Sequence, residues 1–168
     1  KIAIVHCGVD PELYDGPKTK TDRTNMLFVG RLAPEKGVRV LLDALEHSVK
    51  TVSDLQLTIV GDGPDRTELE TMVREKGLND HVIFTGYLAP HDVAKQLAAA
   101  DIFVLPSFAE GVPVSLMEAM ASRVPVIAPR VAGVQELVED GVSGFCVAPG
   151  HVEMLRESIE TLASDYDL

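Results

Sequence analysis

Six short apolar runs alternate with segments of helical spacing along most of this chain, and this alternation limits the folds open to it. The runs are continuous, which is typical of strands buried on both faces. Predicted strands cover 26–29, 57–60, 82–84, 102–105, 124–128 and 145–147, and apolar stripes predict helices over 38–49, 69–73 and 152–162. Such alternation builds βαβ units. We therefore expect an α/β fold with an open, doubly wound, Rossmann-like parallel sheet of about six strands.

The length of 168 residues corresponds to one domain. A closed eight-fold barrel would need more strands than this length supplies. Residues 1–24 differ from the rest, because Gly and Pro interrupt the chain after a possible strand at 2–5. We expect an interdomain strand or linker over 1–24 and a single domain over 25–168. Because the chain starts at Lys1 with an apolar run, we expect it to be a piece of a longer cytoplasmic protein.

The charge balance is strongly acidic, with 26 Asp and Glu against 15 Lys and Arg, for a formal net charge of −11. Proteins that bind duplex DNA or anionic membranes need a basic surface, so we expect no nucleic-acid partner. A small anionic ligand remains compatible, because a few placed cations and a helix N-terminus can hold it. The two cysteines, Cys7 and Cys146, share no metal-ligand spacing and are expected to be buried thiols in a reducing compartment.

Ligands of open α/β sheets bind beyond the carboxyl ends of the strands, so the loops there are the candidate site. Arg31 and Lys36 are the only cations in the loop that follows the first core strand. They would form a diphosphate clamp, in which Arg31 supplies a planar fork of donors, Lys36 supplies a point charge and the helix start supplies backbone N–H groups. The alternative is that both are solvated surface cations. After the second strand, Gly61 and Gly63 form a Gly-x-Gly pattern that favours a tight turn over direct phosphate contact.

The loop after the fourth predicted strand carries Glu110, and the helix after it carries Glu118, seven residues further on. Gly111 would let the backbone approach a ligand, and free N–H groups over 112–115 would cap a phosphate. Glu118 lies beside an apolar row with no Lys or Arg four residues away, so its carboxylate needs donors that a ribose diol would supply. The alternative is two unconnected glutamates.

Metal-binding patterns are weak in this chain. The five histidines are scattered without a ligand pair, and the acid-x-acid pattern at 165–167 is interpreted as a solvated tail. We therefore predict no metal site.

Several blocks, taken in order, resemble the C-terminal half of the group 1 glycosyltransferases, a large retaining family of two-domain GT-B architecture. The blocks are 28–32 with 36–37, 61–64, 84–87, 110–121, 125–128 and 136–144. The resemblance covers about residues 5–162, and its Glu-x7-Glu block is the most specific part.

The resemblance implies that this half binds a nucleotide-diphosphate sugar, while a missing N-terminal domain of the same chain binds the acceptor. Arg31 and Lys36 would hold the diphosphate, Glu110 would contact the sugar, and these three would be the catalytic residues. Glu118 would bind the ribose hydroxyls, and the loop from Tyr87 to His91 would lie near the base. The remaining implied contacts to phosphate or sugar are Gly30, Gly61, Gly111, Val112, Pro113 and Val114. No cofactor or essential metal is implied, because the two cations neutralise the leaving diphosphate.

The whole protein would transfer a sugar to a glycan or glycolipid in the cytoplasm, at a membrane if its missing half binds one, and this chain would be inactive alone. Two alternatives are a sugar-nucleotide epimerase of similar fold, against which the Glu-x7-Glu block argues, and a nucleotide-binding regulatory module. The chain departs from the family at Arg123, with strain expected past a helix end, and at Ala132, in a turn that faces the donor. Both positions usually hold Gly in the family.

Overall fold

The computed structural model describes residues 8–14, 16–19 and 21–164. Within these ranges, six parallel strands form one sheet in the order β3-β2-β1-β4-β5-β6. The strands are β1 (Thr24–Val29), β2 (Leu55–Val60), β3 (Val82–Gly86), β4 (Ile102–Val104), β5 (Val126–Pro129) and β6 (Gly144–Val147). The strand order reverses between β1 and β4, which is the arrangement of a Rossmann-like fold. The predicted fold class is confirmed.

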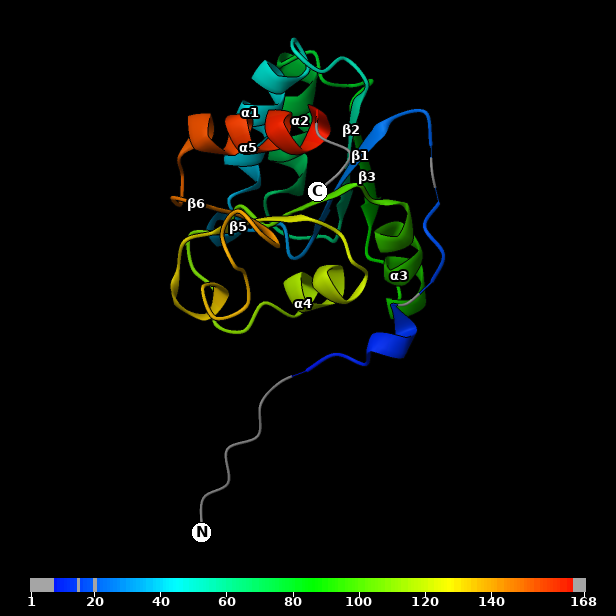
Figure 1. Ribbon diagram of the computed structural model, residues 1–168. Coiled ribbons are helices and arrows are strands. Elements are labelled where there is room, and N and C mark those ends of the chain that lie inside the picture. The colour runs from blue at the N-terminus through cyan, green and yellow to red at the C-terminus, as the bar shows by residue number, and fades with distance from the viewer. Residues whose placement is uncertain (1–7, 15, 20, 165–168) are drawn as a thin grey trace.

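The helices cover both faces of this sheet. They are α1 (Val38–Ser48), α2 (Arg66–Glu75), α3 (Pro90–Ala99), α4 (Val114–Ala121) and α5 (Val152–Ser164), with short 3-10 turns η1 (Pro11–Leu13), η2 (Pro34–Lys36) and η3 (Ala132–Val134). Helices α1, α2 and α5 lie on one face, and α3 and α4 lie on the other (Figure 1).

Each central strand is buried on both faces, which explains the continuous apolar runs. Met26 and Phe28 of β1 pack with α1, α2 and α5, whereas Leu27 packs with α3 and α4. Successive side chains of a strand point to opposite faces, so both faces of a central strand must be apolar.

The first strand starts before its predicted limit because its polar residues are paired. Thr24 and Asn25 lie in β1, opposite β2. The hydroxyl of Thr24 donates to Asp54 at 3.3 Å, and the backbone N–H of Asn25 donates to the Asp101 carboxylate at 2.7 Å. Side-chain partners of this kind let polar residues enter a sheet.

The segment that was predicted to be a linker packs against the domain. Tyr14, which follows η1, is buried in the cluster formed by α3 and α4. Further along, the Thr19 backbone N–H donates to the Ala98 carbonyl at 2.9 Å. The described part of this segment therefore contributes to the core, while the division of the chain into domains stays a prediction.

Two smaller expectations are confirmed. Arg123 has a φ of 55° just past α4, in the left-handed region that strains a side-chain-bearing residue. Cys146 is buried, and burial raises the pKa of its thiol. The possible strand at 2–5, Cys7 and the pattern at 165–167 lie outside the described residues.

Candidate functional site

A cavity of about 410 Å³ opens at the carboxyl edge of the sheet, beyond β1, β2 and β3. It lies next to the point where the strand order reverses, as ligand sites in this kind of sheet do. Five predicted site residues line it: Gly30, Arg31, Gly61, Tyr87 and Glu118. The other lining residues are Val29, Val60, Asp62, Leu88, Pro90 and Val93.

Gly30 and Gly61 bring two strand ends together under this cavity. Gly61 has a φ of 129°, and a Cβ there would overlap the carbonyl oxygen of Gly30. Likewise, a Cβ on the nearby Gly63 would overlap the carbonyl oxygen of Leu32. The Gly-x-Gly turn therefore serves the packing of one loop against the other, as the sequence favoured.

Arg31 is an available cation at this cavity. Its side chain is exposed, and it makes no hydrogen bond or ion pair with any residue in the described ranges. The neighbouring carboxylate of Asp62 accepts from the Gly63 backbone N–H at 2.7 Å and lies 3.5 Å from Arg66. Arg31 therefore keeps its donor fork free for an anion.

Lys36 does not fit the interpretation of a solvated surface cation. Its Nζ lies 2.8 Å from Oε1 of Glu110, whose side chain is only 7% exposed. The Phe108 backbone N–H donates to the Glu35 carbonyl at 2.9 Å, so η2 is tied to the loop after β4. The ion pair lies at the same sheet edge but does not line the 410 Å³ cavity. A ligand that binds Lys36 must share this cation with Glu110.

The loop from Gly111 to Val114 leads into α4 and leaves backbone donors unpaired. The N–H groups of Val112, Val114 and Ser115 have no acceptor in the part of the chain that the structure describes. Pro113 is the N-cap and supplies no side-chain hydrogen bond. Such a helix start carries partial positive charge.

The η3 turn packs against this loop. Gly133 has a φ of 29°, and a Cβ there would overlap the carbonyl oxygen of Gly111. Ala132, which departs from the glycine usual in the family, is exposed beside it. The Gly111 loop is therefore held between α4 and η3.

Glu118 already has one protein donor, which the sequence did not predict. The Tyr14 hydroxyl donates to Oε1 of Glu118 at 2.6 Å, in a part-buried position. Burial and this hydrogen bond raise the pKa of Tyr14, so its hydroxyl stays protonated. Glu118 therefore does not depend on a ligand alone for its hydrogen-bond donors, and its contact with a ribose stays a prediction. The two residues lie 104 positions apart, and no local pattern links them.

Tyr87 stands at the mouth of the cavity with 81% of its surface exposed. Leu88, Pro90 and Val93 form an apolar wall beside it. Leu88 and Pro90 belong to the loop over 87–91 that the resemblance placed near the base. Sequence reasoning missed Val93, which lies in the first turn of α3.

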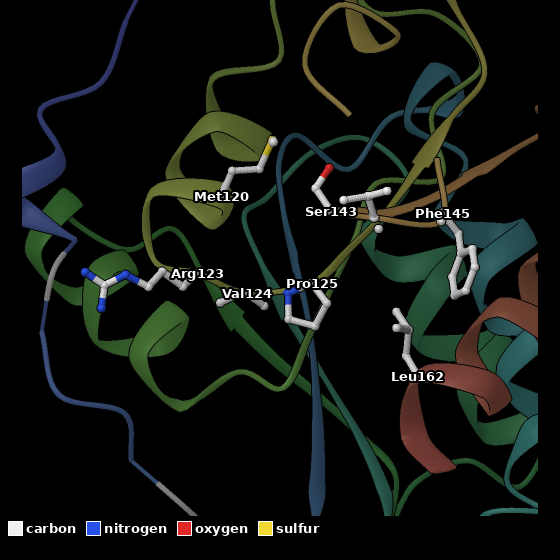
Figure 2. Close-up of a pocket in the computed structure, with 10 residues that line it drawn as sticks. Met120, Arg123, Val124, Pro125, Ser143, Phe145 and Leu162 are labelled. Carbon is white, nitrogen blue, oxygen red and sulfur yellow. The ribbon is translucent and has the colours of Figure 1, made fainter. Parts of the chain in front are cut away.

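A second cavity, of about 230 Å³, opens at the opposite, amino edge of the sheet (Figure 2). Met120, Pro125, Phe145 and Leu162 line it, and the side chain of Arg123 points away from them. None of the predicted site residues belongs to it.

Residues 11–168 match the family model described as glycosyl transferases group 1. The chain belongs to this family. The α-D-kanosaminyltransferase of Streptomyces kanamyceticus is 35% identical to it over 147 residues, which cover 88% of this chain and 38% of that protein. The chain thus spans less than half the length of this curated relative.

Solved structures share this fold, and one of them is a domain of a group 1 family glycosyl transferase. Anabaena HepE, solved with UDP and glucose, is 29% identical with a TM-score of 0.85, over 97% of this chain and 47% of HepE. The C-terminal domain of LpcC from Francisella tularensis is 26% identical with a TM-score of 0.82. That match covers 94% of this chain and 89% of the LpcC domain. The fold is one Rossmann-like half of the GT-B architecture.

No helix in the described ranges has the length and apolarity needed to cross a bilayer. Nor do three His, Cys, Asp or Glu side chains gather into a possible metal site among the described residues. That donor binding needs no metal stays a prediction.

Proposed function

We propose that this chain is the donor-binding domain of a retaining glycosyltransferase that transfers a sugar from a nucleotide-diphosphate sugar to a glycan or glycolipid. A preceding domain of the same protein would hold the acceptor. The observation that carries the proposal is the single cavity in which Arg31, Tyr87 and Glu118 come together.

The cavity offers a place for each part of the nucleotide. The base lies against the exposed ring of Tyr87 and the apolar wall next to it. The ribose hydroxyls donate to Glu118, whose Oε2 has no partner in the described residues. The diphosphate lies between Arg31 and the unpaired N–H groups at the start of α4, one helical turn from Glu118. HepE, which was solved with UDP and glucose, supports this choice of ligand.

Transfer of the sugar leaves negative charge on the departing diphosphate, which the protein must stabilise. Arg31, Lys36 and the N-terminus of α4 all place positive charge at this sheet edge. Such preorganised charge is effective because it needs no rearrangement during the reaction. Glu110, held by Lys36, lies where it can orient the sugar.

Replacing Lys36 with alanine is expected to weaken UDP or GDP binding about tenfold or more, since a charged hydrogen bond contributes about 1.5–3 kcal/mol. The measurement is calorimetry on the 168-residue chain. Lys36→Ala also leaves the buried Glu110 carboxylate without its ion-pair partner. The matched control is therefore the double variant Lys36→Met/Glu110→Gln, which removes both charges. Unchanged affinity in both variants would refute the diphosphate role of Lys36.

Glu118→Ala and Glu110→Gln are expected to separate nucleotide binding from sugar binding. Glu118→Ala weakens binding of the nucleoside diphosphate and of the intact sugar nucleotide alike, about tenfold or more, because both ligands contain ribose. Glu110→Gln does not weaken binding of the free diphosphate, because it removes a competitor for Lys36, and it weakens binding of the intact sugar nucleotide. Calorimetry with UDP and UDP-glucose, or with GDP and GDP-mannose, measures both. Equal loss of free UDP or GDP in the two variants would show that Glu110 is misassigned.

A further inference from the structure

The hydrogen bond between Tyr14 and Glu118 joins two parts of the chain that the proposed function does not connect. Tyr14 lies before β1, in the segment that packs on α3, and Glu118 lies in the second turn of α4. The 2.6 Å bond from the phenol to Oε1 is the only hydrogen bond to the Glu118 side chain among the described residues.

Tyr14 is itself held firmly. The residue is 7% exposed in the core cluster, and its backbone N–H donates to the Pro11 carbonyl at 3.0 Å. The η1 turn that precedes it is capped by the Asp10 carboxylate, which accepts from the Glu12 N–H at 3.1 Å. A buried ring on a capped turn has little freedom, so the position of its hydroxyl is fixed.

The phenol reaches Glu118 from outside the nucleotide cavity. Glu118 lines the 410 Å³ cavity, whereas Tyr14 lines a separate cavity of about 360 Å³ against α3. A carboxylate has about four acceptor positions, so one bond from Tyr14 leaves Oε2 and part of Oε1 open. The phenol thus restrains the carboxylate without taking the place of a ligand.

We propose that Tyr14 is a positioning residue for ribose recognition, which holds the Glu118 carboxylate so that it accepts both ribose hydroxyls. This inference rests on the proposed function, because it assigns Glu118 to the ribose. In the absence of the phenol, the Glu118 side chain has several rotamers available, and the ligand must select one of them.

The test compares UDP with 2′,3′-dideoxy-UDP by calorimetry on the 168-residue chain, with GDP and dideoxy-GDP as a second pair. We expect wild type to prefer the ribose form about tenfold or more, as for charged hydrogen bonds. Tyr14→Phe, which keeps the buried ring, should reduce this preference about fivefold by weakening only the ribose form. Glu118→Ala should abolish the preference, and Tyr14→Phe should change nothing further in that background.

If Tyr14 had a purely structural role, Tyr14→Phe would lower the stability or weaken binding of the ribose and dideoxy nucleotides equally. Urea unfolding of Tyr14→Phe measures the change in stability. The inference is overturned if Tyr14→Phe keeps the wild-type preference for the ribose form, or if it binds UDP and GDP more tightly than wild type. In that case, loss of the preference in Glu118→Ala would still support the proposed function. Wild type that binds neither UDP nor GDP would overturn both. If wild type bound the ribose and dideoxy forms with equal affinity, Glu118 would not bind the ribose hydroxyls, and the inference would be overturned as well.

Discussion

Gly61→Ala is expected to lower the free energy of unfolding by about 4 kcal/mol, combining backbone strain with steric overlap. The strain arises because Gly61 has a φ of 129°, which L-residues rarely adopt. The overlap arises because the new Cβ would fall onto the carbonyl oxygen of Gly30, which is backbone and cannot rotate away. Urea denaturation followed by far-UV circular dichroism measures the loss, since the chain contains no Trp.

The matched control is Gly77→Ala. Gly77 has a φ of 69°, but a Cβ there would meet no atom within 4 Å. Strain alone should then cost about 1–2 kcal/mol. Equal losses in the two variants would contradict the conclusion that the loops after β1 and β2 pack through Gly61.

The 168-residue chain is expected to bind a nucleotide sugar without measurable transfer. It spans 38% of the length of the kanosaminyltransferase, and its described residues offer one Rossmann-like half of a two-domain fold. Orientation of a second substrate is worth about 7–11 kcal/mol of activation free energy, and that orientation would come from a second domain. Closure of two domains would also exclude water from the cleft.

Incubation of the chain with radiolabelled sugar nucleotides and a crude acceptor extract tests this expectation, with transfer and donor hydrolysis followed in parallel. A longer chain from the same gene, extended to the length of the relatives, serves as the positive control. Transfer by the 168-residue chain at the rate of the longer chain would refute the expectation. Nucleotide binding without transfer in both chains would favour a regulatory module.

The sequence determined the sheet and the edge that carries the site. Continuous apolar runs such as 102–105 have to be buried on both faces, so they predict a parallel sheet between two helical layers. Parallel strands end at one edge, so the loops that begin at Gly30, Gly61 and Tyr87 had to lie along it. Local periodicity and chain direction are sufficient for these conclusions, because neither depends on the order of the strands.

Only the tertiary structure decided which side chains meet across that edge. Lys36 and Glu110 are 74 residues apart, and Tyr14 and Glu118 are 104 apart. Each pair depends on β1 and β4 being neighbours and on how α4 packs beside them. The sequence placed Tyr14 in a linker because its surroundings contain Gly, Pro and charged residues. Its burial comes from an apolar surface that α3 and α4 create together, which exists only after distant segments have packed.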